Sequence, residues 1–311
     1  MVLSSPLAIA GEVPVLRLSV LQFGTAHWEL DHIQRHGLDR QAGFELEVRL
    51  VAHLPASRIA VSSGDVQGAV VDLMWAQARY EQGEPYLYLP FSSSIGEILV
   101  AEDSEIDSIV DLRGRRIGVA GGPDSKGWVL LKRVAADRGL DLEREAEVSY
   151  AAPPLLDEAL RRGRIDVLVT YWHFAARLKA AGGVRTAWQM AALLDALSLD
   201  RDLPVLGYVF REEWVREHHD LLDRFAGSLV EAKQQLAEEP SHWAAIRPLM
   251  RVENEADFEA LRQGFIAGTP AALDARRIAD LQRLLVLTGA SPDRVLPERL
   301  FYRADASRRA P

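Results

Sequence analysis

The chain has 311 residues, with 48% hydrophobic and 26% charged side chains, which is ordinary for a globular protein of one or two domains. The formal net charge of −9 disfavours nucleic-acid binding, and no run approaches the roughly 18 apolar residues that a membrane span needs. There is no cysteine, which excludes disulfides, thiolate metal sites and cysteine nucleophiles.

The first 13 residues, "MVLSSPLAIAGEV", have no basic region and only a short apolar stretch. Ala8, Ile9 and Ala10, followed by Gly11, fit the A-x-A rule of a signal-peptide cleavage site. Two interpretations stay open: residues 1–13 are the remnant of a truncated or removed export signal, or they are a leader before the first strand.

Two stretches about 100 residues apart then follow one plan, which indicates an internal repeat. Each begins with an apolar strand, at Leu16–Leu21 or Arg116–Val119, and turns through glycine into a helix with a Trp in its first turn. Each helix ends in Gly-Leu-Asp, where glycine suits a helix stop. A second strand, a proline-containing loop, a short helix ending at Gly64 or Gly163, and a third strand follow.

This order predicts a strand–helix–strand–helix–strand unit twice, and therefore two α/β lobes with a parallel or mixed sheet in each. We expect lobe 1 to comprise residues 14–92 and 205–290, and lobe 2 residues 95–200. Between them, Tyr86–Pro90 and Ile95–Ala101 read as strands flanking a crossover.

The return to lobe 1 and the C-terminal region follow. Val205–Phe210 reads as the returning strand and Asp220–Glu238 as a helix. The chain after Pro240 is predicted to be helical to about Thr288, and the tail 291–311 to be loosely held.

The stretch "RRIGVAGGPDSKGW", residues 115–128, reads as a glycine-rich turn between a strand and a helix, a place where nucleotide phosphates often bind. It lacks G-x-x-x-x-G-K-[ST], and its glycines do not have the G-x-G-x-x-G spacing. Two interpretations remain. One is a tight turn with Asp124 or Ser125 as helix cap, and the other is a loop whose N–H groups and Lys126 hold an anionic or polar group.

Two longer segments, "SIVDLRGRRIGVAGGPDSKGWVLLKRVAADRGLD" and "EALRRGRIDVLVTYW", resemble motifs of the substrate-binding proteins of ABC transporters of the nitrate/sulfonate/taurine type. This family includes the thiamine-precursor-binding (NMT1-like) and SsuA-like groups. The resemblance covers most of residues 14–240. It implies a two-lobed "Venus flytrap" of the type II periplasmic-binding-protein fold that closes on a small solute by hinge motion. Tyr171, Trp172 and His173 stand where the family often has W-[ED]-P, so no acidic ligand contact is carried over there.

Ligands of such sheets lie beyond the carboxyl ends of the strands, so the predicted ligand-binding residues are those that follow strand ends or lie at the crossover. They are Gln22, Phe23, Thr25, His27, Trp28, Asp72, Trp75, Ser92, Ser93, Gly121, Gly122, Asp124, Ser125, Lys126, Trp128, Tyr171, Trp172 and His173. The four Trp residues of this set are expected to be partly exposed to the cavity between the lobes.

No catalytic residue, cofactor or metal is predicted. His32 and His36 share one helix face and with His27 could form a metal cluster, but we interpret them as an exposed polar face. His218 and His219 are expected at the surface.

The sequence therefore predicts a monomeric, extracytoplasmic (periplasmic) protein that captures a flat or aromatic solute with one anionic group and delivers it to an ABC permease. The alternatives are a cytoplasmic two-lobed biosynthetic enzyme of the menaquinone-pathway type, for which His27 and His173 are available, and a binder of an oxoanion, an alkanesulfonate or a metal chelate.

Overall fold

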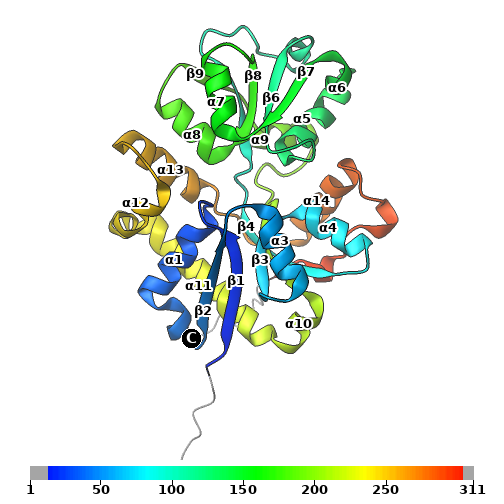
Figure 1. Ribbon diagram of the computed structural model, residues 1–311. Helices are drawn as coiled ribbons and strands as arrows, with labels where there is room; N and C mark the ends of the chain where they lie inside the picture. The colour runs from blue at the N-terminus through cyan, green and yellow to red at the C-terminus, as the bar shows by residue number, and fades with distance from the viewer. Residues whose placement is uncertain (1–12, 304–311) are drawn as a thin grey trace, which may run out of the picture.

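The computed structural model describes residues 13–303 and contains two five-stranded mixed sheets, one in each of two lobes (Figure 1). We name lobe 1 after the sheet with strand order β2-β1-β3-β10-β4 and lobe 2 after the sheet with order β7-β6-β8-β5-β9. The predicted fold class is confirmed. Ala8, Ile9 and Ala10 lie outside the described residues.

The strands of lobe 1 are β1 (Val15–Leu21), β2 (Glu45–Val51), β3 (Gly68–Asp72), β4 (Tyr86–Ser92) and β10 (Leu206–Arg211). Those of lobe 2 are β5 (Gly96–Ala101), β6 (Arg116–Ala120), β7 (Glu147–Ala151), β8 (Val167–Tyr171) and β9 (Val184–Gln189). The strands of the repeat, β1–β3 and β6–β8, pair in parallel, whereas β5 and β10 run antiparallel to their neighbours.

The helices that accompany lobe 1 are α1 (Ala26–His36), α2 (Leu38–Gln41), α3 (Leu54–Ser63), α4 (Leu73–Glu81), α10 (Glu212–Glu217), α11 (His219–Glu238), η2 (Pro240–His242), α12 (Trp243–Met250), α13 (Glu255–Ala267), α14 (Ala275–Leu287), η3 (Pro292–Arg294) and η4 (Glu298–Leu300). Those of lobe 2 are η1 (Ile109–Leu112), α5 (Lys126–Ala136), α6 (Leu142–Glu145), α7 (Pro153–Arg161), α8 (Trp172–Ala180) and α9 (Met190–Ala196). No helix among residues 13–303 is both long and apolar enough to cross a bilayer.

Helix boundaries follow local chemistry. Gly37 ends α1 in the left-handed conformation at φ 65°, as the glycine stop predicts. The prolines expected in loops instead stand in the first turns of α3 and α7, where a missing N–H costs no hydrogen bond. Strand β4 also runs on through Ser92, because Ser92 still pairs with Leu206, so the crossover starts later than expected.

The segment after α14 is packed, contrary to the predicted loose tail. Leu296, Leu300 and Phe301 are buried, and Phe301 forms a bridge to Tyr88 of β4. The apolar side chains of residues 296–301 cover an edge of lobe 1, which outweighs the proline and arginine content that suggested a free tail. The prediction for 304–311 lies outside the described residues.

The two lobes also touch away from the crossovers. Helix α8 of lobe 2 packs on α13, a helix of lobe 1 that lies at one side of the molecule (Figure 1). Arg177 of α8 donates a 2.7 Å hydrogen bond to the carbonyl of Met250 at the end of α12. This contact brings Trp172, at the start of α8, against the core of lobe 1.

Candidate solute-binding cleft

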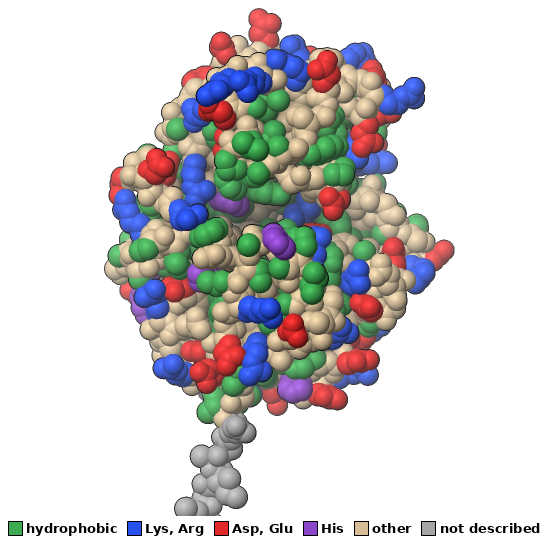
Figure 2. All heavy atoms as spheres, in the orientation of Figure 1, with side chains coloured by type: hydrophobic (Ala, Val, Ile, Leu, Met, Phe, Trp, Pro, Cys, Tyr) green, Lys and Arg blue, Asp and Glu red, His purple; other side chains and the backbone are tan. Residues whose placement is uncertain are grey.

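Segments that follow strand ends in both lobes come together between the lobes. In lobe 1 they follow β1 and β3, and in lobe 2 they follow β6 and β8. Figure 2 shows a hollow between the lobes with cationic and histidine side chains at its edge. A ligand-binding cleft is expected at this place in α/β sheets.

Asp72 of β3 is the centre of a charged group. Its Oδ1 accepts from the Trp75 N–H (2.9 Å), which caps α4, and its Oδ2 accepts from Arg58 Nη2 (2.7 Å). Burial raises the pKa of Asp72, but Lys126, Arg58 and the Trp75 N–H outweigh it, so the pKa lies below its ordinary value. Asp72 is therefore an ionised, half-buried carboxylate at neutral pH.

The charge of Lys126, in the other lobe, also acts on Asp72. Burial lowers the pKa of its ammonium group, while the Asp72 carboxylate is the strongest opposing influence. Arg58 lies close enough to lower the pKa of Lys126 further. Arg58 bonds the half-buried Asp72 carboxylate and Lys126 acts on it from the other lobe, while the exposed Asp124 is a second acid beside Lys126. We call Arg58, Asp72, Asp124, Lys126 and Tyr171 the cleft cluster.

The glycine turn before α5 fits closely against Tyr171. Gly121 has φ +95°, and a Cβ on it would lie 2.6 Å from Tyr171 Oη. Burial and the carboxylates of Asp124 and Asp72 raise the pKa of the Tyr171 hydroxyl, which is consequently a neutral donor. Glycine is required here both for the conformation and for the approach of the phenol.

Helix α5 begins without a side-chain cap. Ser125 occupies the N-cap position, as one interpretation expected, but neither its side chain nor that of Asp124 makes a capping hydrogen bond. First-turn N–H groups of a helix without a cap are free to meet a ligand, and the helix dipole favours an anion. Gly127 has a different role, since a Cβ there would lie 2.5 Å from Met190 of α9.

The prediction that four Trp residues are partly exposed in a cavity is wrong for Trp28 and Trp128. Both are buried, with 2% and 0% of their surface exposed. Trp28 packs against Trp243 and Phe265, because the late helices α12 and α13 fold over it. Large apolar rings at these positions complete the cores of the lobes instead of facing solvent.

The other two Trp residues, Trp75 and Trp172, are less completely buried. Trp75 is half-buried and packs against Tyr86 with tilted rings, whose centres are 5.2 Å apart, and Arg79 lies over the Trp75 ring. Trp172 is 8% exposed and lies edge-on to Trp28, 6.3 Å away, so it bridges the two lobes. Trp172 lies at a contact between the lobes, so its surroundings change when the lobes move.

The loop after β1 contributes exposed and half-buried groups. Gln22 and Phe23 are exposed, Thr25 is buried, and the His27 ring bonds to the Gln22 carbonyl (3.1 Å) rather than joining other histidines. Arg251 lies 3.9 Å above the Phe23 ring. Phe23 and Arg251 thus form an exposed aromatic–cation pair in lobe 1.

His173 is half-buried and nearly parallel to Tyr171 (interplanar angle 13°). Burial, helped by Arg177, lowers the pKa of His173 to about 3. Its buried Nδ1 has no partner among the described residues. The ring is therefore a neutral imidazole at neutral pH.

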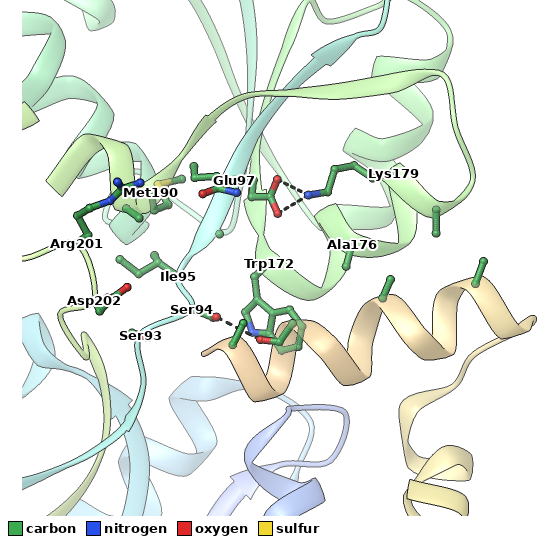
Figure 3. Close-up of a pocket in the computed structure, with 18 residues that line it drawn as sticks. Ser93, Ser94, Ile95, Glu97, Trp172, Ala176, Lys179, Met190, Arg201 and Asp202 are labelled. Atoms are coloured by element: carbon green, nitrogen blue, oxygen red, sulfur yellow. Dashed lines mark hydrogen bonds and ion pairs between the residues drawn. The ribbon is translucent and has the colours of Figure 1, made fainter. Parts of the chain in front are cut away.

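The serines at the crossover bind protein rather than face the cleft cluster. Ser93 Oγ donates to the Gly268 carbonyl (3.3 Å), and Ser92 Oγ accepts from the Ser94 N–H (3.1 Å). A cavity of about 560 Å³ lies beside this crossover, between lobe 2 and α13 (Figure 3). Its Lys179 is paired with Glu97 at 2.7 Å, and Arg201 also lines it (Figure 3).

Sequence reasoning missed Arg58, Arg177 and Arg251. Arg58 stands in an ordinary position of α3, and only the fold brings it to Asp72. Arg177 bonds the Met250 carbonyl of the other lobe, and Arg251 lies over the Phe23 ring; both contacts depend on the tertiary structure. Nothing in the spacing of these arginines distinguishes them from solvated helix residues.

Comparisons with known proteins agree with this architecture. The periplasmic aliphatic sulphonate-binding protein SsuA of Escherichia coli has a TM-score of 0.74 and 17% identity, covering 91% of this chain and 92% of that one. SsuA of Xanthomonas axonopodis pv. citri, an alkanesulfonate-binding protein bound to MOPS, has a TM-score of 0.69 and 21% identity, with 95% and 100% covered. A ligand-binding component of an ABC-type import system from Staphylococcus aureus, solved with zinc bound, has a TM-score of 0.67 and 14% identity, with 92% and 97% covered.

A search of curated proteins finds no match. The solved structures establish the fold, which is that of periplasmic binding proteins. The family model described as "NMT1/THI5 like" matches residues 37–242, about two thirds of the sequence. The chain therefore belongs to the NMT1/THI5-like family.

Proposed function

We propose that this protein captures a small organic anion between its two lobes and delivers it to the permease of an ABC importer. Family membership and the likeness to binding components of import systems support this proposal. We further propose that the two lobes move as rigid bodies about the crossovers. Lobe 1 comprises residues 14–92 and 205–290, lobe 2 comprises residues 95–200, and residues 291–303 move with lobe 1.

The cleft cluster is the observation that carries the proposal. Arg58 of lobe 1 bonds the Asp72 carboxylate, and the charge of Lys126 in lobe 2 acts on the same group. The carboxylate of Asp124 offsets part of the positive charge of Arg58 and Lys126, but it is exposed, so solvent weakens its effect. Asp72 is already bonded to Arg58. A solute carboxylate or sulfonate would bind Lys126 and the first-turn N–H groups of α5 while closing the lobes.

The remaining groups favour a flat solute. Tyr171 and His173 stack as a pair, and Phe23 is exposed at the opposite lobe. A planar ring can lie along such surfaces. The sulfonates named for the relatives fall within the anionic class, and MOPS, whose ring is saturated, probes the sulfonate site without a planar ring.

The proposed ligand-facing residues are the cleft cluster and its neighbours in both loops. They are Arg58, Asp72, Asp124, Lys126, Tyr171, His173, Gln22, Phe23, His27, Gly121 and Gly122.

A thermal-shift screen tests the function. The probes are MOPS, taurine, benzoate, benzenesulfonate, a pyrimidine and ATP. A true ligand at a hundredfold excess over its Kd stabilises the chain by about 2.7 kcal/mol. Lys126→Ala should abolish the shift, whereas Lys132→Ala on the same helix, whose cation pairs with Glu143, should keep it.

Three outcomes would contradict the proposal. Stabilisation by ATP that depends on Lys126 would indicate a nucleotide site. Conversion of a bound probe to product, followed by NMR, would indicate an enzyme. A shift that survives Lys126→Ala and Arg58→Ala would place the solute elsewhere.

We also propose that the protein works in the periplasm as a monomer. The periplasmic location of the SsuA relative supports the first point. Fractionation of cells expressing the natural gene, and light scattering of the purified chain, test the two points separately.

A further inference from the structure

Three histidines that are not part of the cleft cluster meet on lobe 1. His32 and His36 stand one turn apart on α1, and His242 ends the short η2 turn after α11. The ring centres are 4.2 Å apart for His32–His36, 4.8 Å for His32–His242 and 4.6 Å for His36–His242. One ring nitrogen from each lies within 4.8 Å of the others.

The deepest of the three rings is oriented by hydrogen bonds. His32 is buried, and its Nε2 lies 2.8 Å from Gln235 Oε1. Gln235 donates from its own Nε2 to Glu231 (3.1 Å), so its carbonyl oxygen faces the ring. Nε2 of His32 consequently carries the proton, and its Nδ1 keeps a lone pair for a metal.

Glu239 can supply a fourth ligand for the metal. The Glu239 carboxylate lies 3.3 Å from His242 Nε2 and is otherwise exposed. It can complete a tetrahedron or orient the His242 ring, with water as the fourth ligand.

The geometry points to a divalent transition-metal site, selective for Zn²⁺ over Ca²⁺ and Mg²⁺, formed by His32, His36 and His242 with Glu239 or water. Imidazole nitrogens suit zinc, and alkaline-earth ions prefer oxygen. Tetrahedral ligands at about 2.0 Å from zinc are about 3.3 Å apart, so the rings must draw together slightly. His36 is exposed and His242 half-buried, so both can turn toward a fixed His32.

A bound metal would stabilise the part of lobe 1 on which Trp172 of lobe 2 packs. His242 directly precedes Trp243, whose ring packs 6.2 Å from Trp28 of α1. A metal bound by α1 and the turn before α12 therefore ties together the two helices that hold Trp28, on which Trp172 rests.

The experiment uses the tag-free full chain, stripped with EDTA and titrated with ZnCl₂ by calorimetry and thermal melting. One ion per chain is expected, with an affinity about 100-fold or more above that of His36→Asn and His242→Asn. The control His219→Asn changes an exposed histidine elsewhere on lobe 1 and should bind as the parent does. CoCl₂ should give the visible absorption of a tetrahedral site, which both cluster variants lose.

His36 is exposed, so His36→Asn keeps the test decisive even where His242→Asn fails to fold. Equal zinc binding by the parent and His36→Asn, or no binding by the parent at 1 mM, would overturn the site. The cleft solute plays no part in this measurement, so either proposal can fail without the other.

Discussion

Asp72 sets the charge balance of the cleft cluster, because its carboxylate partly neutralises both Arg58 and Lys126. Asp72→Asn should keep the α4 cap, since asparagine caps helices about as well as aspartate. With the competing carboxylate gone, affinity for an anionic solute should rise about tenfold, equal to about 1.4 kcal/mol.

Calorimetry at two salt concentrations checks this, with the gain shrinking at high salt. Weaker binding by Asp72→Asn would mean that the carboxylate contacts the solute directly.

Asp157 of α7 gives a prediction on stability. Burial raises its pKa to about 6, only partly opposed by Arg161 and Arg177. A carboxyl whose pKa is higher in the folded chain than the ordinary 3.8 binds its proton more strongly when folded, so stability is lost as the pH rises from about 4 to 6. Asp157→Asn removes this loss.

At pH 7.5 we expect Asp157→Asn to be more stable than the parent by about 1–2 kcal/mol, less than the full shift implies because the group is partly solvated. Urea unfolding should show the difference vanish near pH 4. Glu158→Gln, a change in the neighbouring exposed carboxylate, should not reproduce this pH pattern. An equal gain at both pH values would contradict the explanation.

At the scale of elements, the contact between α8 and α13 depends on a missing side chain. A Cβ on Gly264 of α13 would lie 2.5 Å from the Trp172 ring, which rests on this helix (Figure 3). Gly264→Ala should therefore destabilise by about 1–3 kcal/mol through overpacking, reduced by the better helix propensity of alanine.

Gly227 of α11 is the matched control, because a Cβ there meets nothing within 4 Å. Gly227→Ala should stabilise by about 0.5–1 kcal/mol in thermal unfolding. Equal stabilisation by both variants would show that Trp172 does not rest on Gly264.

At the scale of the whole molecule, Trp172 reports lobe closure. It is 8% exposed where α8 meets lobe 1, and separation of the lobes would bring it into water. The solute-free chain should open at least part of the time, and a bound solute should then blue-shift Trp emission.

Trp172→Phe should remove the spectral change, whereas Trp214→Phe on α10, away from the cleft, should retain it. Small-angle scattering should show a smaller radius of gyration with solute. An emission change that persists in Trp172→Phe would assign the signal to another ring.

Much of the fold was determined by the sequence itself. The strands, the glycine at the end of α1, the repeat and the two crossovers are encoded within windows of a few residues, where periodicity and backbone preference act. The position of Asp72 and Tyr171 at strand ends, and of Gly121 just after one, follows from the same signals, so part of the candidate site was predictable.

Only the tertiary structure decided the rest. Burial of Trp28 depends on α12 and α13, Arg58 reaches Asp72 through the packing of α3, and His242 joins His32 and His36 across more than 200 residues. Such contacts form when distant segments bury their apolar faces together, and no local pattern records which partners will meet. For this reason the sequence determined the lobes and the strand ends, whereas packing between distant helices decided which side chains face the cleft, the core or each other.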